Sequence, residues 1–265
     1  MTPEILKNIN PLTLVTLGVL FTWMLNNLGA ALSFIFPVIN RKVLDFLLGL
    51  SGGIMLAASI WSLLIPSVEI SNFFNLPGWI VGGTAFILGG VTVKAIDSIL
   101  PHVHIGSDNV EGIPSNFRRV TLLYLAMTLH HIPEGFAVGV ALGAMGLIPE
   151  YSGIPVAVGI GIQNIPEGLA LAVAMLAYGI SKIKSFIYSV LSGFSEVVGG
   201  VVGLLFIVSF PQLLPISLGI AAGAMFFVVI EEVIPESQLS GNTDISTIGA
   251  MVGFIVMMTL DTIQI

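Results

Sequence analysis

The sequence has no cysteine and very little charge. Its 265 residues include eight lysine and arginine residues against 15 acidic residues, and only 9% of all residues are charged. The absence of cysteine excludes disulfides, thiolate metal sites and cysteine nucleophiles, so any soft metal would need histidine, methionine or carboxylate ligands. A chain of this length with so few charges is too apolar for a soluble globular domain.

Apolar residues are abundant instead. They make up 55% of the chain, and the mean hydropathy is +1.04. Windows of about 20 residues, the length that crosses a bilayer as a helix, predict a multi-pass, all-α membrane protein with eight transmembrane helices. The predicted spans are roughly 12–36, 43–66, 77–94, 120–148, 155–180, 184–210, 213–233 and 245–261.

The connections between these spans are short, which predicts one transmembrane domain covering residues 1–265. The longest connection is a loop at about 100–117. Basic residues follow the first span, surround this loop and follow the fifth span. The positive-inside rule therefore places these connections in the cytoplasm and both termini outside the cell (inner or plasma) membrane. The segment after the seventh span is expected to be a loop without bases; it carries Glu231, Glu232 and Glu236.

Two matching phrases interrupt the apolar runs. The fourth span contains His130-His131-Ile132-Pro133-Glu134-Gly135, and the fifth contains Gln163-Asn164-Ile165-Pro166-Glu167-Gly168. Polar and acidic side chains are costly inside a membrane, so they usually mark a functional site. One such phrase would be read as a proline kink with a hydrogen-bonded neighbour. Two phrases with the same Ile-Pro-Glu-Gly core favour a buried cation site.

The spacing within each phrase places ligand-type side chains on one helix face. His130 lies four residues before Glu134, and Gln163 lies four before Glu167, so each pair shares one helix face. His131 and Asn164 lie three residues before the same glutamates and therefore also face them. The prolines are expected to bend both helices, and the glycines to permit close approach or unwinding. This mixed nitrogen and oxygen set suits Zn(II) and would admit Fe(II), Mn(II), Co(II), Ni(II) or Cd(II).

Other residues have two readings each. Glu196 is a lone acid in the sixth span, which either pairs with a hydroxyl or lysine or serves as a further metal ligand. From composition alone, Met55 is expected to be an ordinary residue of the hydrophobic core. His102 and His104 in the long loop are either solvated residues near a proline turn or a loose metal-collecting pair.

The two phrases and the eight-span layout resemble the ZIP family of zinc and iron permeases, and segments 55–64 and 232–237 resemble its prokaryotic GufA-type branch. The resemblance covers the whole chain. It implies an inverted 3+2+3 repeat bundle, a homodimer, and divalent-metal transport, usually zinc uptake into the cytoplasm, through a binuclear site between helices four and five. The implied first position consists of His130, Glu134, Gln163 and Glu167; Glu134 and Glu167 bridge to a second position with His131, Asn164 and Glu196, and Met55 is a lesser contributor.

A membrane-embedded zinc hydrolase is the rival from another class. Such an enzyme needs a stable zinc with an open water position and a nearby base. The chain has only four histidines, two of them in a loop, and no HExxH helix. We therefore expect a transporter and not an enzyme, with divalent metal ions and the lipid bilayer as partners, no catalytic cofactor and no nucleic acid. No nucleotide-binding loop is present in the sequence, so direct ATP drive is not expected.

The resemblance also exposes two departures. Family members commonly carry asparagine where this chain has His131, and some carry aspartate where it has Asn164. Neutral Asn164 lowers the negative charge of the second position, so this position should bind more weakly or prefer zinc over harder ions. We predict that Asn164→Asp changes the order of affinities among divalent metals, measured by competition binding. An unchanged order would contradict the hypothesis.

Overall fold

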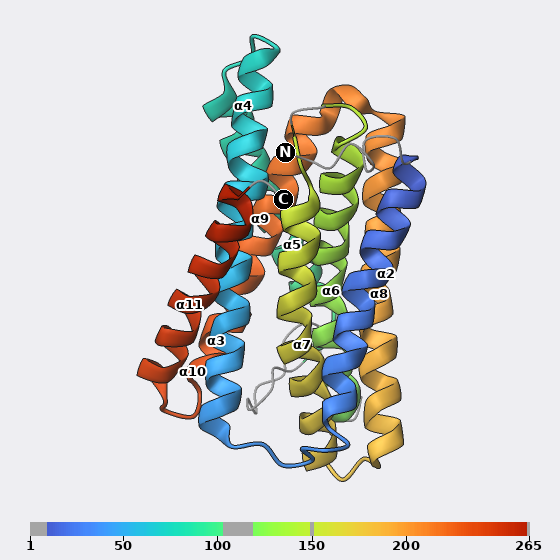
Figure 1. The fold of residues 1–265 in the computed structure, drawn as a ribbon, viewed down its shortest axis with the longest axis vertical. Coiled ribbons are helices and arrows are strands. Elements are labelled where there is room, and N and C mark those ends of the chain that lie inside the picture. Colours follow the sequence, from blue (N-terminus) through green and yellow to red (C-terminus); the bar gives the residue numbers. More distant parts are fainter. Residues whose placement is uncertain (1–9, 103–118, 149–150, 264–265) are drawn as a thin grey trace.

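The computed structural model describes residues 10–102, 119–148 and 151–263, which form an elongated helical bundle (Figure 1). These ranges contain eight helical spans and no strand, as predicted. Two spans are interrupted by π-helical segments. The spans are α2 (Pro11–Leu32); α3 (Arg41–Ala57) with η1 (Ala58–Leu64) and α4 (Ile65–Phe73); α5 (Gly78–Ile99); α6 (Arg119–Ala144); α7 (Ile154–Ala177); α8 (Lys182–Ser209); η2 (Pro211–Leu213) with α9 (Leu214–Val228), η3 (Val229–Val233) and α10 (Ile234–Gln238); and α11 (Thr243–Thr262).

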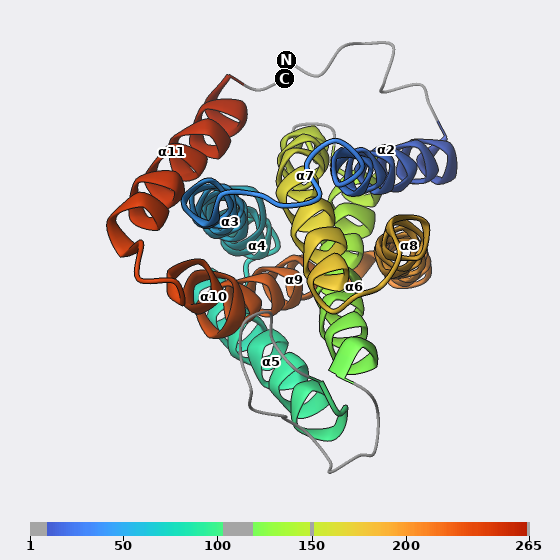
Figure 2. The same ribbon diagram turned by 90° about the horizontal axis from the view of Figure 1, so that it is seen from below.

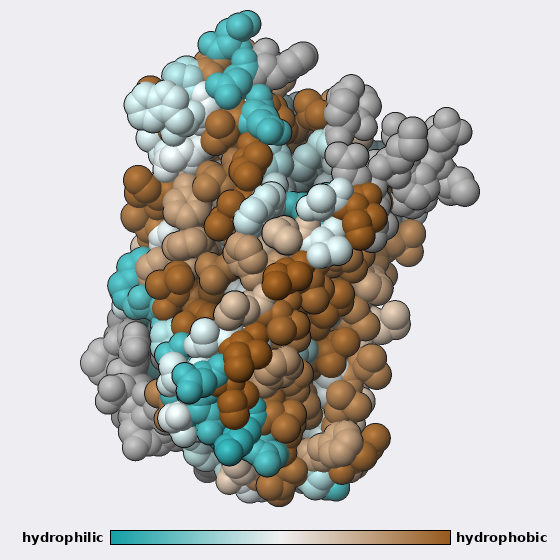
Figure 3. All heavy atoms as spheres, turned by 60° about the vertical axis from the view of Figure 1, so that its left-hand side comes forward, coloured by the Kyte–Doolittle hydropathy of each residue, from teal (hydrophilic) through white to brown (hydrophobic). Residues whose placement is uncertain are grey.

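The outer surface of the bundle suits a membrane. Seven spans are long and apolar enough to cross one. The exception is α6, which carries the two histidines, the proline and the glutamate of the first phrase. Large apolar side chains such as Ile87, Leu205 and Met251 are more than half exposed. Apolar residues dominate the face drawn in Figure 3, and hydrophilic ones gather mainly toward its ends.

The helices form two groups, which Figure 2 shows from one end. In one group α2 contacts α7 and α8, and α6 contacts α8. In the other α3 contacts α11, and α5 contacts α9. The groups meet where α3 contacts α7 and α6 contacts α9. Suppose that the first three spans are exchanged in order with the last three, and α6 with α7. The α2–α8 contact then maps onto itself, and each of the other contacts becomes another one of the set. The arrangement therefore agrees with the expected inverted 3+2+3 repeat.

The second and seventh spans extend further than their hydropathy predicted. Each contains a π-helical segment, η1 or η3, that leads directly into an Ile-Pro pair at 65–66 or 234–235. The expectation of a loop carrying Glu231, Glu232 and Glu236 was wrong. Glu231 and Glu232 lie within η3, Glu236 lies in α10, and Glu232 and Glu236 are buried. Burial among helices allows acidic residues to continue a span that a hydropathy window ends.

A proline in the second span is compensated by a residue far along the chain. In an α-helix the amide of residue 66 would donate to the carbonyl of Ser62, but Pro66 has no amide. The hydroxyl of Tyr151, just before α7, donates to this carbonyl at 2.9 Å, and the Ser62 hydroxyl donates to Asp261 Oδ1 of α11 at 2.9 Å. The Tyr151 bond connects the two helix groups, and the Asp261 bond connects the second span to α11 within one group. By contrast, α6 and α7 continue as helices through their own prolines.

The glycines of the two phrases are points of close helix approach. A Cβ built on Gly135 would lie 1.9 Å from the carbonyl oxygen of Glu196 in α8, and one on Gly168 would lie 2.2 Å from that of Asn26 in α2. No real side chain fits at these distances. Because the flanking helices remain regular, the glycines serve close approach and not unwinding. The contact at Gly135 also fixes the backbone that presents Glu196.

We predict that Gly135→Ala lowers stability by about 1–3 kcal/mol, because the added methyl group forces α6 away from α8. Thermal unfolding of the purified protein in detergent measures this change. Gly83→Ala is the matched control, since a Cβ at Gly83 meets nothing within 4 Å. Equal unfolding midpoints for the two variants would contradict the prediction.

Candidate metal centre

The middle of α6 and α7 brings three potential metal ligands together. His131, Glu134 and Glu167 each offer one ligand atom, and these three atoms lie within 4.8 Å of one another. Their exposed fractions are 1%, 1% and 4%. The two predicted phrases therefore do meet in the bundle core.

Two carboxamides hold the neighbouring carboxylates. Gln163 Nε2 donates to Glu134 Oε1 at 2.8 Å. Asn164 Nδ2 donates to Glu196 Oε2 at 2.8 Å and to the Thr22 carbonyl at 3.2 Å. Each amide thus uses its donor group on its neighbours, which leaves its carbonyl oxygen as a further possible ligand.

Six buried atoms around this centre have no hydrogen-bond partner among the described residues. They are His131 Nε2, Glu134 Oε2, Gln163 Oε1, Asn164 Oδ1, Glu167 Oε2 and Glu196 Oε1. His131 Nδ1 lies 3.3 Å from Ser192 Oγ, so Nε2 is its unpartnered ring nitrogen. Buried polar atoms are normally satisfied, and a cation would accept an electron pair from each of these six donors.

The charge of the centre leads to the same conclusion. Glu134, Glu167 and Glu196 are all buried, and no lysine or arginine pairs with them among the described residues. Burying an unpaired carboxylate costs several kcal/mol even after the protein relaxes. A divalent cation would supply the missing positive charge.

Hydroxyl groups support the centre from other helices. Ser51 of α3 donates to Glu167 Oε1 at 2.5 Å, and Ser192 Oγ of α8 lies 3.3 Å from His131 Nδ1. Sequence reasoning missed both serines. They belong to no motif, and helical spacing on α6 or α7 carries no information about residues on α3 and α8.

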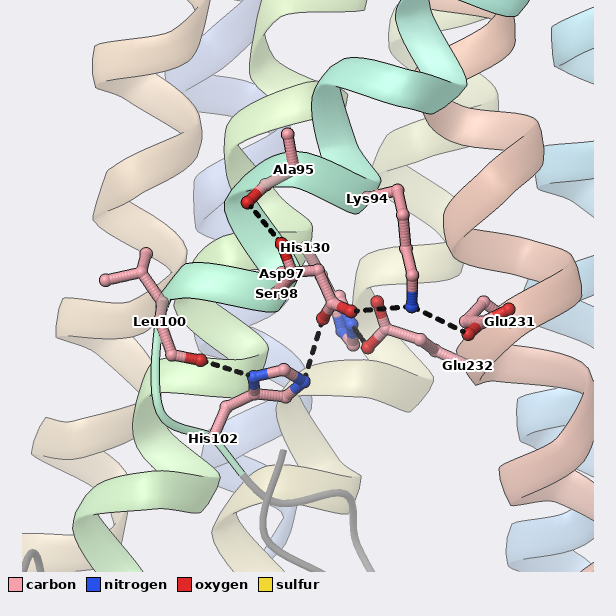
Figure 4. Close-up of polar contacts among 9 residues, drawn as sticks. All are labelled: Lys94, Ala95, Asp97, Ser98, Leu100, His102, His130, Glu231 and Glu232. Carbon is pink, nitrogen blue, oxygen red and sulfur yellow. Dashed lines mark hydrogen bonds and ion pairs between the residues drawn. The ribbon is translucent and has the colours of Figure 1, made fainter. Parts of the chain in front are cut away.

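His130 faces a different neighbour. Its Nε2 contacts a carboxylate oxygen of Glu232 in η3 (Figure 4). It lines one cavity of about 60 Å³ with Asp97 and Glu232, and a smaller one of about 10 Å³ with Glu167 and Glu236. His130 therefore stands between the centre and the other helix group, and its role as a metal ligand stays a prediction.

The two acids on this side, Glu232 and Glu236, were expected only in a loop. One signal in the sequence pointed to Glu236. The triplet Ile-Pro-Glu of the two phrases occurs a third time at 234–236.

The remaining candidates are more scattered. His102 is buried, with Nε2 2.8 Å from Asp97 Oδ1 and Nδ1 2.8 Å from the Leu100 carbonyl, so it is not a solvated loop residue. His104 and most of the loop at about 100–117 lie outside the described residues. Met55 is fully buried in the hydrophobic core beside η1, and the hydroxyl of Ser59 donates to its carbonyl.

The fold and this centre define a class: a multi-pass helical membrane protein whose two central helices enclose a cluster of potential metal ligands. Comparison with known proteins identifies the family. The sequence model described as "ZIP Zinc transporter" matches residues 104–261. Zinc transporter ZIPB of Bordetella bronchiseptica is 37% identical, over 89% of this chain and 76% of its own length. GufA of Myxococcus xanthus is 35% identical, over 88% and 92%, and ZIP11 of Homo sapiens 34%, over 92% and 95%. The chain belongs to the ZIP family.

We predict that Ser51→Ala weakens metal binding by about tenfold or more, as is usual when a hydrogen bond that orients a ligand is lost. Without the hydroxyl, Glu167 loses the bond that points its other oxygen toward the centre. Calorimetric titration of the purified protein with Zn(II) measures the change. Affinity equal to that of the wild type would show that Ser51 does not orient Glu167.

Proposed function

We propose that this protein transports divalent metal ions, zinc foremost, across a cell membrane through the centre between α6 and α7. The observation that carries the proposal is the set of six unpartnered electron-pair donors around three buried carboxylates. The names of the relatives, all zinc transporters, support zinc as the main substrate. The donors are nitrogen and oxygen atoms, so Cd, Fe, Mn, Co and Ni ions are further substrates in this proposal.

The proposed centre binds two ions. Glu134 and Glu167 each have a second carboxylate oxygen without a hydrogen bond, so both can bridge. His131, Asn164 and Glu196 complete one position. Gln163 and His130 complete the other, for which His130 must exchange Glu232 for the metal. Met55 remains a lesser contributor.

The centre lies where the two helix groups meet, and this location suits transport. Glu167 belongs to one group and its partner Ser51 to the other, and the same is true of His130 and Glu232. A dication cannot cross a membrane bare, so the protein must replace its water ligands near the midplane and open to one side at a time. Relative movement of the groups, by rocking or sliding, would change which side reaches the ion.

Basic residues support the direction of transport. Lys182 Nζ donates to the Phe34 carbonyl at 3.2 Å, and Arg41 contacts the Glu236 carbonyl at 3.5 Å. Connections rich in bases therefore gather at one end of the bundle. The start of α2 and the end of α11 lie at the other end (Figure 1). By the positive-inside rule the basic end is cytoplasmic and both termini are outside, which suits uptake. A single domain over residues 1–265, a homodimer and the absence of enzymatic activity belong to the same proposal.

We predict that Glu134→Ala combined with Glu167→Ala reduces zinc uptake by about tenfold or more, since both positions lose their shared ligands. Proteoliposomes that contain a zinc-sensitive dye measure uptake directly. Asp244→Ala, which removes an exposed acid at the start of α11, is the control and should transport normally. Uptake by the double variant at the wild-type rate would contradict the proposal. Peptide or lipid hydrolysis by the wild type without metal flux would favour the hydrolase alternative.

A further inference from the structure

A second group of charged residues lies beside the metal centre, toward the end of α5. Lys94 of α5 stands between two acids: its Nζ is 3.6 Å from Asp97 Oδ2 and 3.5 Å from Glu231 Oε1 of η3 (Figure 4). We call Lys94, Asp97, Glu231 and Glu232 the Lys94 cluster. Its ion pairs connect the third span to the π-helical segment of the seventh.

Polar side chains connect this cluster to the metal centre. His130 contacts Glu232, and the two residues line the 60 Å³ cavity together with Asp97. His130 also lines the smaller cavity together with Glu167, a residue of the centre. An ion that leaves the centre past His130 therefore reaches the carboxylates of the Lys94 cluster.

The charges of the cluster determine how that ion would be held. Asp97 is 7% exposed at its side chain, and together with Glu231 it could hold a divalent cation between α5 and η3. Lys94 already places a positive charge between these two carboxylates. A tethered ammonium competes with the metal for the same oxygens, and it repels a dication nearby.

An ordinary structural ion pair would behave differently. The side chain of Lys94 is 52% exposed and that of Glu231 is 44% exposed. Exposed pairs of this kind contribute little to stability. A structural role for Lys94 therefore predicts small effects on both folding and transport, and no benefit from removing its acidic partner.

We infer that Lys94 is a positioning residue for transport, a built-in counter-charge that prevents the metal from settling between Asp97 and Glu231 and thereby sets the rate of its release. This inference rests on the proposed function. It assigns Lys94 no role as a metal ligand. It requires only that the positive charge remain next to the two carboxylates.

Zinc uptake into proteoliposomes tests the inference through a set of charge changes. Lys94→Gln should lower the maximal rate several-fold while the zinc concentration for half-maximal uptake stays the same or falls, because the metal is held too tightly. Lys94→Arg keeps the charge and should transport at near the wild-type rate. Lys94→Gln combined with Glu231→Gln removes one charge of each sign and should restore the rate. Lys182→Gln, at an exposed lysine of the same end, is the matched control and should leave uptake unchanged.

Several outcomes would overturn the inference. A wild-type maximal rate for Lys94→Gln, or a double variant as slow as the single one, would leave Lys94 with only a structural role. Unfolding midpoints of all variants, measured in detergent, identify any loss of rate that comes from misfolding. If Lys94→Gln misfolds, Lys94→Arg still tests the inference, because it keeps the charge and should transport at near the wild-type rate. Different results would contradict the proposed function itself. These are a wild type that imports no zinc, or normal zinc import by the double alanine variant at Glu134 and Glu167.

Discussion

The burial of negative charge is the constraint on which the rest of this structure depends. Glu134, Glu167 and Glu196 are at most 4% exposed in the core of an apolar bundle, and the described part of the chain offers them no lysine or arginine. Each carboxylate therefore gains from hydrogen bonds and from a cation supplied from elsewhere. Carboxamides on α7 and a serine on α3 supply part of this compensation. They can do so only because the helices approach closely, and Gly135 permits that approach between α6 and α8.

The fold was largely predictable because hydropathy is a local property. All eight spans were found, and most ends agree within a few residues. The seventh span was cut short at residue 233, since a hydropathy window counts Glu236 as solvated. The burial of Glu232 and Glu236 depends on α3, α5, α6 and α7, which approach them only in the folded bundle. The π-helical segments were equally invisible, because no residue pattern in the chain distinguishes a π turn from an α turn.

The candidate site was predictable only in part, since three of the predicted residues lie together as possible metal ligands while their arrangement could not be derived. His130 precedes Glu134 by four residues and His131 precedes it by three. Helical spacing therefore placed both histidines on the same face as Glu134. Which histidine joins the carboxylates depends on the rotation of α6 about its axis. Contacts with other helices fix this rotation: Gly135 lies against α8, Ser192 approaches His131, and Glu232 contacts His130. These are tertiary contacts, and a single sequence does not reveal them.

The two charged regions of the molecule differ in a way that suits the passage of an ion. The metal centre has unpaired lone pairs and no positive side chain, so it gains from binding a dication. The Lys94 cluster has carboxylates too, but a lysine already neutralises part of their charge. Conduction requires sites that bind well enough for entry and weakly enough for exit. An ion that moves from the centre past His130 would therefore meet carboxylates again but with a lysine beside them, so that affinity falls along the path although carboxylates remain among the ligands.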